Sequence, residues 1–218
     1  MANVDVKNLL LADFICHGVP SPKIWREYLD QKEKQHHSKI EKINFRNKKH
    51  GWHDYYMNIC FKNGKEYLKS HYTDPFMYWF LSDYSIRKSC FHCPFRMVNQ
   101  SNSDITLGDA WLMKKETKQH DRGKSLVIVN TKKGLDFLNQ ITENIVLRET
   151  DYTQYFAPEK QMMSYDKREQ FFTDYLKAGK MKSFQRKYYY QGKLLKNYLK
   201  HILYLADYKK IIGKLKRS

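Results

Sequence analysis

Short apolar runs alternate with segments of helical periodicity along the first two-thirds of the chain. Leu9–Cys16 is an apolar run that predicts a buried strand, and Ile40–Arg46 predicts another. Between them, Ser21 is placed to cap a helix with Pro22 at its first position, and an amphipathic pattern continues to about His37. The pattern therefore predicts a strand, a helix and a second strand, in this order.

A β-hairpin is predicted next along the chain. Large apolar residues alternate with other residues over Tyr55–Phe61, Asn63–Gly64 supplies a two-residue turn, and Tyr67 lies on the returning strand. An Asp-Pro pair then begins a second helix, Asp74–Ile86. A cysteine pair follows that helix and is expected in a loop.

Strand signals continue along the chain and fade beyond Glu149. Ile105–Trp111 and Leu126–Asn130 predict strands, and Gly134–Ile141 predicts a helix. Beyond Glu149 the sequence predicts mainly helix. The expected fold is α/β, with α+β as the alternative: a mixed sheet with flanking helices and a β-hairpin, followed by a helical tail.

Positive charge is concentrated at the C-terminal end. The formal net charge is +17, and beyond residue 180 a single acid, Asp207, stands among many basic residues. They are Lys182, Arg186, Lys187, Lys193, Lys196, Lys200, Lys209, Lys210, Lys214, Lys216 and Arg217. We therefore expect one domain over residues 1–180 and a basic amphipathic helical tail over residues 181–218.

The tail has apolar residues at helical spacing, among them Leu195, Leu199 and Ile202. It is predicted either to pack on its own domain or to dock on an acidic partner subunit or an anionic membrane surface. Nucleic acid is disfavoured as a partner because no nucleic-acid-binding motif accompanies the charge. No run approaches the roughly 20 apolar residues of a membrane span, and the start lacks the features of a signal peptide. The expected location is cytoplasmic, with peripheral membrane binding through the tail as an option.

Cys90 and Cys93, in the sequence Cys-Phe-His-Cys-Pro, form the sharpest local motif. Two thiolates three positions apart in a loop can hold a tetrahedral metal ion or an iron–sulfur cluster, and a following proline is typical of ferredoxin-like clusters. A single such pair leaves zinc, a redox dithiol and incidental cysteines open. Cys16 and His17 end an apolar strand, where ligands gather in α/β sheets, but a small buried thiol is the favoured interpretation from the residues alone.

Other residues receive structural interpretations. Cys60 lies within the hairpin strand and is interpreted as structural. The histidines near lysines, at positions 36, 37, 50 and 53, are expected to be solvated. Gly108 and Asp109 are unusual within a strand and indicate either close approach of a ligand or an ordinary bulge. Gly123-Lys-Ser is not a phosphate-binding loop, because the required upstream glycine is absent and Ser125 begins a strand.

Five ordered segments together resemble one family, the C-terminal domain of the coenzyme F-420 hydrogenase/dehydrogenase beta subunit. A further marker is Lys167-Arg168, before Phe171-Phe172. The segments are Asp13–Ser21 with Trp25 and Tyr28, Ile43–Lys48 with Gly51 and Trp52, Arg87–Cys93, Ser103–Trp111, and Gly123–Thr131 with Gly134. The resemblance covers about residues 8–180 and favours iron–sulfur over zinc.

The resemblance implies an oxidoreductase component that carries FAD and a 4Fe-4S cluster, fed by a ferredoxin-like module or subunit. Single electrons would pass through clusters to a flavin, which exchanges hydride with an organic substrate. It also implies cluster ligation by Cys16, Cys90 and Cys93, and places His17, Gly108 and Asp109 near the flavin.

Complete members of the family begin with a two-cluster ferredoxin domain and a Gly-Thr-Pro-Cys-Gln segment, and neither occurs in this sequence. The usual basic residue before Ser-Asp-Ile-Thr is also replaced, by Ser101 and Asn102, and the usual Trp-Gly by Trp111-Leu112. We therefore expect a truncated or split form whose cluster lacks one thiolate. The alternatives are a non-catalytic remnant or an electron-transfer partner subunit.

Overall fold

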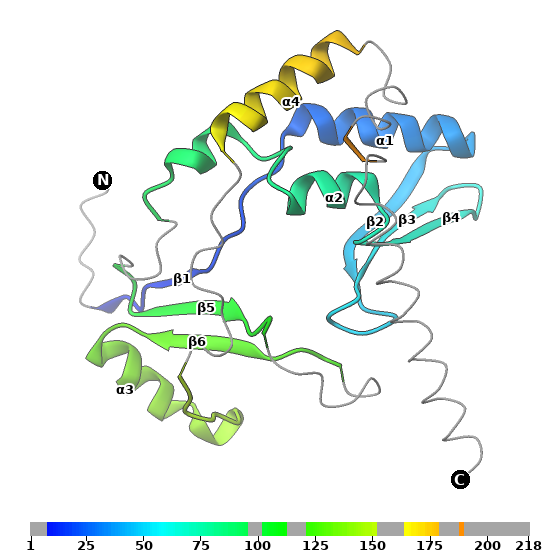
Figure 1. Cartoon of the computed structure of the whole chain (residues 1–218). Helices are drawn as coiled ribbons and strands as arrows, with labels where there is room; N and C mark the ends of the chain where they lie inside the picture. Colours follow the sequence, from blue (N-terminus) through cyan, green and yellow to red (C-terminus); the bar gives the residue numbers. More distant parts are fainter. Residues whose placement is uncertain (1–7, 96–101, 113–120, 152–163, 179–187, 190–218) are drawn as a thin grey trace. The chain divides into compact units, whose positions relative to one another are not determined.

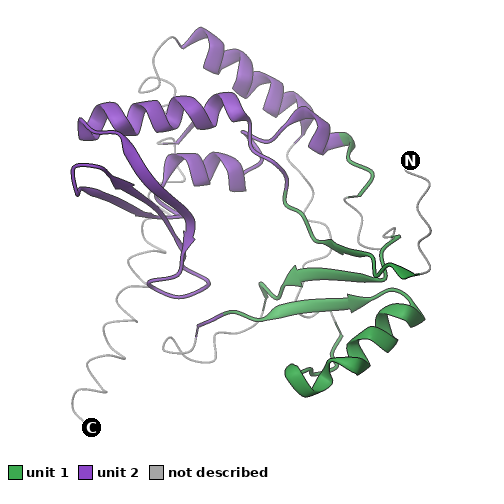
Figure 2. Cartoon of the chain, turned by 180° about the vertical axis from the view of Figure 1, so that it is seen from behind, with its two compact units in different colours: residues 1–17, 92–114, 123–161 green, residues 18–91, 115–122, 162–218 purple. Residues whose placement is uncertain are grey.

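The computed structural model describes residues 8–95, 102–112, 121–151, 164–178 and 188–189 (Figure 1). The chain forms two compact units (Figure 2). Unit 1 comprises residues 1–17, 92–114 and 123–161, and unit 2 comprises residues 18–91, 115–122 and 162–218. The chain passes from unit 1 to unit 2 after His17 and returns to unit 1 after Phe91.

Unit 1 contains a mixed three-stranded sheet. Its strands are β1 (Ala12–Phe14), β5 (Ile105–Asp109) and β6 (Ser125–Val129), in the order β1-β5-β6. β1 runs parallel to β5, and β6 runs antiparallel to it. The mixed sheet expected from the sequence is therefore confirmed. β1 is shorter than the predicted strand, although Ile15 still donates its N–H to Leu107 at 2.8 Å. The prediction that this strand is buried is wrong, because Leu9, Leu11 and Phe14 are exposed.

Helix α3 (Lys132–Gln140) follows β6 directly and lies beside it (Figure 1). The Thr131 side chain caps it by accepting the N–H of Gly134 at 3.1 Å, and donates to the buried Asp104 carboxylate at 2.7 Å. That carboxylate also accepts the N–H of Leu11 at 2.9 Å and pairs with Lys133 at 2.9 Å. These donors lower the pKa of Asp104 to about 2. One carboxylate thus joins the start of β1 to the start of α3.

Unit 2 is built around a second, antiparallel sheet. β2 (Ile40–Asn47), β3 (Tyr56–Phe61) and β4 (Glu66–Ser70) occur in sequence order. The predicted hairpin is confirmed: Ile59 pairs with Tyr67, and Gly64 occupies the turn with φ of +79°, a conformation that suits glycine. The hairpin and β2 thus form a sheet of their own.

Helices α1 (Pro22–His36) and α2 (Pro75–Leu81) lie beside this sheet (Figure 1). Helix α4 (Tyr165–Lys177) packs on α2, where Phe171 contacts Trp79. The core they enclose is largely aromatic. Its fully buried members include Tyr28, Met57, Ile59, Phe61, Phe76, Trp79 and Phe171. A mixed α/β architecture is therefore confirmed, with separate sheets in the two units.

Two helix boundaries differ in detail from those expected. Ser21 precedes α1 and Pro22 begins it, as predicted, but the Ser21 side chain makes no capping bond. α2 begins as predicted, since the Asp74 side chain accepts the N–H of Met77 at 2.8 Å. It ends well before Ile86 because Asp83 adopts a left-handed conformation with φ of +65°, which interrupts a helix.

A buried polar group lies inside the unit 2 core. Asp74 is fully buried and accepts hydrogen bonds from the hydroxyls of Tyr28 at 2.6 Å and Tyr67 at 2.8 Å. Lys32, only 6% exposed, places its ammonium 3.7 Å from the centre of the Tyr67 ring. Burial raises the pKa of Asp74 and lowers that of Lys32 to about 8. The core thus holds a buried carboxyl group and a buried amine among aromatic rings.

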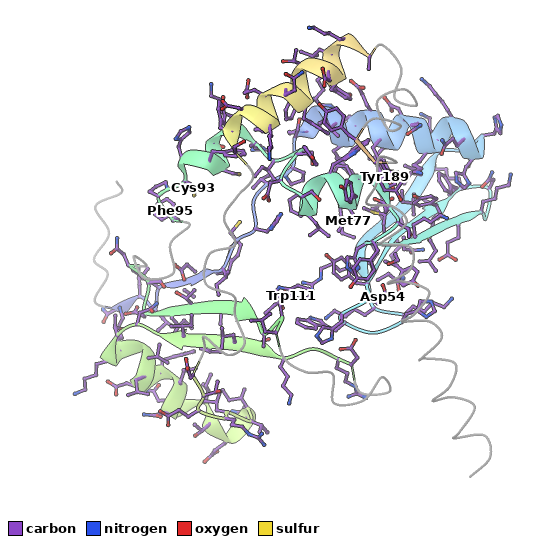
Figure 3. All side chains as sticks on the ribbon, viewed as in Figure 1. Asp54, Met77, Cys93, Phe95, Trp111 and Tyr189 are labelled. Atoms are coloured by element: carbon purple, nitrogen blue, oxygen red, sulfur yellow. The ribbon has the colours of Figure 1, made fainter. Side chains whose placement is uncertain are left out.

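The C-terminal tail lies outside the described residues apart from Tyr188 and Tyr189. Tyr189, labelled in Figure 3, is buried, and its hydroxyl donates to the carbonyl of Thr73. The division at residue 180 and the tail helix stay predictions. Among the described helices, none is both long and apolar enough to cross a membrane.

Candidate cluster-binding site

Backbone pairing in unit 2 joins the segment after Cys16 to the segment before Cys90. Val19 and Ser21 lie on the first segment. The carbonyl of Val19 accepts the N–H of Arg87 at 2.8 Å, and the N–H of Ser21 donates to Ser85 at 2.6 Å. An antiparallel bridge between Pro20 and Ile86 lies between these two bonds. Residues 18–21 and 85–87 therefore lie side by side, although they are far apart in the sequence.

Gly18 is required by this pairing. Its φ is +142°, and a Cβ atom added there would lie 3.2 Å from Cγ2 of the buried Ile86. Both the backbone conformation and the space favour glycine. Close packing against the segment that leads to Cys90 thus explains why the Cys-His-Gly motif has glycine at position 18.

Cys90 lies in a short 3-10 turn, η2 (Lys88–His92), and is half-buried. The N–H of Cys90 donates to the carbonyl of Arg87 at 3.1 Å, which fixes the start of the turn. The N–H of Val19 donates to the Cys90 sulfur at 3.4 Å. Hydrogen bonds to sulfur are one of the means by which proteins adjust the potentials of iron–sulfur clusters. The structure therefore links the two cysteine motifs through a bond to a sulfur atom.

Cys16 and Cys93 are exposed, and neither forms a disulfide. The expectation of a buried thiol at Cys16 is therefore wrong. Cys93 follows η2, with the exposed Phe95 two residues further on (Figure 3). Cys16 and Cys93 belong to unit 1 and Cys90 to unit 2. In the described part of the chain, no three His, Cys, Asp or Glu side chains converge as a metal site.

The donor set fits an iron–sulfur cluster in its chemistry. Three free thiols are present, two of them exposed and the third receiving an N–H bond. Thiolate sulfur is the usual protein ligand of such clusters. Cys60 differs from the three. It is half-buried within β3 and donates to the Asn58 side chain at 3.7 Å, which supports its structural interpretation.

Gly108 and Asp109 lie in strand β5 of unit 1, where neighbouring residues of the sheet surround them. A Cβ atom at Gly108 would lie 2.7 Å from Cδ1 of Ile15, so Ile15 already fills the space that this glycine leaves. Asp109 is half-buried and pairs with Ser125 in the β5–β6 ladder. This surrounding does not fit a flavin cradle on the Cβ side of Gly108. Flavin contact through Gly108, Asp109 or the exposed His17 stays a prediction.

The structure also contains a histidine–carboxylate pair that sequence reasoning missed. Nδ1 of His53 lies 2.6 Å from Oδ1 of Asp121, and the N–H of His53 donates to the other carboxylate oxygen at 3.0 Å. The N–H of Trp52 donates to the Asp121 carbonyl at 2.7 Å. These bonds attach residue 121 to the loop before β3. Asp121 lies 68 positions from His53 in the sequence, so no local pattern predicts the pair. The one nearby signal in the sequence is the Gly51-Trp52 motif that precedes His53.

The prediction of solvated histidines is therefore wrong for His53. It is also wrong for His36, whose ring stacks on Phe61 with centroids 4.2 Å apart. Burial lowers the pKa of His36. His50 is half-buried. His37 is exposed, as expected, and ends α1 in a left-handed conformation.

These features define a mixed α/β protein whose cysteine motifs are joined by backbone pairing. Over residues 1–154 its sequence matches the family model that describes the C terminus of the coenzyme F420 hydrogenase/dehydrogenase beta subunit. The chain belongs to this family, as the motifs indicated. Separate comparisons with curated proteins and with solved structures gave no significant match. The family supports an oxidoreductase role of the beta-subunit type within a multi-subunit enzyme.

Proposed function

We propose that this chain binds a 4Fe-4S cluster through Cys16, Cys90 and Cys93 and transfers electrons in an F-420 hydrogenase/dehydrogenase-type complex. The observation that carries the proposal is the bond from the Val19 N–H to the Cys90 sulfur. It joins a residue three positions after Cys16 to a residue three positions before Cys93. A ferredoxin-like module or subunit is the proposed donor, and FAD the second cofactor, the latter on the family match alone.

The protein's own part in this function is to present and orient sulfur. When bound, the cluster supplies one-electron transfer. The paired backbone of residues 18–21 and 85–87 holds Val19 where its N–H reaches Cys90. Gly18 permits the close approach on which that pairing depends. The exposed Cys16 and Cys93 thiols remain accessible for ligation.

The proposal predicts which cysteines matter. Anaerobic reconstitution with iron and sulfide should give the wild-type protein a broad absorption band in the visible blue. Serine at Cys90 or Cys93 should abolish the band, because thiolate ligands hold the cluster. Cys60→Ser is the matched control and should retain it, since Cys60 lies within β3 and bonds to Asn58. Equal loss in all three variants, or no band in the wild type, would contradict the proposal.

A further inference from the structure

Within unit 2, helix α4 contacts both the Cys90 turn and the segment that precedes it. The Tyr165 ring packs edge-on against Phe91, with centroids 5.5 Å apart, and the Lys88 ammonium lies 5.5 Å from the same tyrosine ring. One helical turn further on, Nε of Arg168 donates to the carbonyl of Ile86 at 2.8 Å. Residues three apart lie on one face of a helix, so a single face of α4 reaches both contacts.

Arg168 is held firmly in this position. It is 8% exposed, its guanidinium lies 4.1 Å from the centre of the Phe172 ring, and Nη1 donates to Glu169 at 2.5 Å. Burying a guanidinium is costly unless its donors are satisfied. The carbonyl it binds belongs to Ile86, the residue that bridges to Pro20 and packs against Gly18. Arg168 thus acts on the pairing that places Val19 beside Cys90.

We propose that α4 is the positioning element of the candidate cluster site, with Arg168 as the residue that fixes the bond between Val19 and the Cys90 sulfur. The inference rests on the proposed function, because it treats Cys90 as a cluster ligand. It extends that function to residues 165–177, which lie beyond the residues matched by the family model. Arg168 touches no ligand in this scheme and acts through Ile86, Arg87 and Val19.

Removing the Arg168 side chain should weaken the hydrogen bond between Val19 and the Cys90 sulfur. Without the Arg168 donor, the Ile86 carbonyl loses its partner and the pairing of residues 18–21 with 85–87 loosens. The Val19 N–H then spends less time on the Cys90 sulfur, so the free thiol becomes more accessible. In the loaded protein the cluster loses an N–H bond to sulfur, which lowers its reduction potential.

Alkylation of the full-length, metal-free protein tests the positioning role without any cluster. Iodoacetamide labelling at about pH 10, where free thiols are ionised, followed by peptide mass spectrometry, should show Cys90 reacting about fivefold faster in Arg168→Met, the factor that loss of a hydrogen bond worth about 1 kcal/mol gives. Cys60 should react at an unchanged rate. Arg168→Lys keeps a donor and should recover part of the protection.

Phe171→Leu is the matched control on the same helix. Phe171 packs against Trp79 and Tyr84 in the core, so this variant weakens α4 packing without touching the bond to Ile86. In this variant iodoacetamide should alkylate Cys90 at the same rate as in the wild type. Equal acceleration in Phe171→Leu, or none in Arg168→Met, would overturn the inference. After reconstitution, Arg168→Met should also show a lower reduction potential than Phe171→Leu. A wild type that forms no cluster would instead contradict the proposed function, while the alkylation rates still decide the role of α4.

Discussion

Lys32 should make the stability of this protein rise with pH in the mildly alkaline range. Burial lowers its pKa from 10.5 to about 8, opposed in part by Asp74 and reinforced by Lys69. The folded chain therefore releases this proton at a lower pH than the unfolded chain. Between these two values the unfolded state binds more protons, so raising the pH stabilises the fold. Below about pH 8 the lysine is protonated in both states, and burying its ammonium lowers the free energy of unfolding by a constant amount of about 3 kcal/mol.

The expected change is large enough to measure. From about pH 7 to about pH 9.5 the free energy of unfolding should increase by about 2 kcal/mol from this group alone. Burial also raises the pKa of Tyr28 and Tyr67. Above about pH 10 these tyrosines reverse the trend, because the unfolded chain ionises them first. The measurement therefore stops below that pH.

Urea unfolding followed by tryptophan fluorescence, at several pH values, is the appropriate assay. Lys32→Met keeps the length of the side chain and removes the titrating group, so its stability should lack the rise of about 2 kcal/mol. Lys62→Met changes an exposed lysine and should behave as the wild type. Parallel pH profiles for the wild type and Lys32→Met would refute the reasoning.

Three further changes test other parts of the molecule. Gly134→Ala should lower the free energy of unfolding by about 3 kcal/mol, because its Cβ would strike the Asp104 carbonyl; urea unfolding measures this, with the exposed Leu135→Ala as control. Asp121→Ala should cost about 2 kcal/mol, since it leaves His53 without its acceptors; an unchanged melting temperature would contradict this. Deleting residues 190–218 should abolish co-sedimentation with anionic vesicles; equal binding of the intact chain to neutral vesicles would remove that interpretation.

Features set by neighbouring residues were predictable from the sequence. The hairpin follows from alternation and an Asn-Gly turn, and both α1 and α2 begin at a proline that follows a serine or aspartate. These signals are local, so no tertiary information is needed to interpret them. The end of α2 was not predictable, because the left-handed conformation of Asp83 has no comparable signal in the neighbouring residues.

Features that depend on distant partners could not be predicted. Lys32 lies on the buried face of α1 with Ile24 and Tyr28, and the ring that covers its ammonium, Tyr67, belongs to a different element. His53 finds its carboxylate 68 positions away. In the candidate site, sequence identified the cysteines, but the donor to the Cys90 sulfur lies 71 positions from it. Only the fold brings such groups together.

The central claim is that Cys90 is a ligand of an iron–sulfur cluster, and low-temperature electron paramagnetic resonance tests it most directly. The wild-type protein, reconstituted anaerobically and reduced with dithionite, should give the fast-relaxing signal of a reduced four-iron cluster. Cys90→Ser should lose that signal, and Cys60→Ser should keep it. A wild-type protein that gives no such signal and binds zinc instead, or a Cys90→Ser variant with an undiminished signal, would contradict the account.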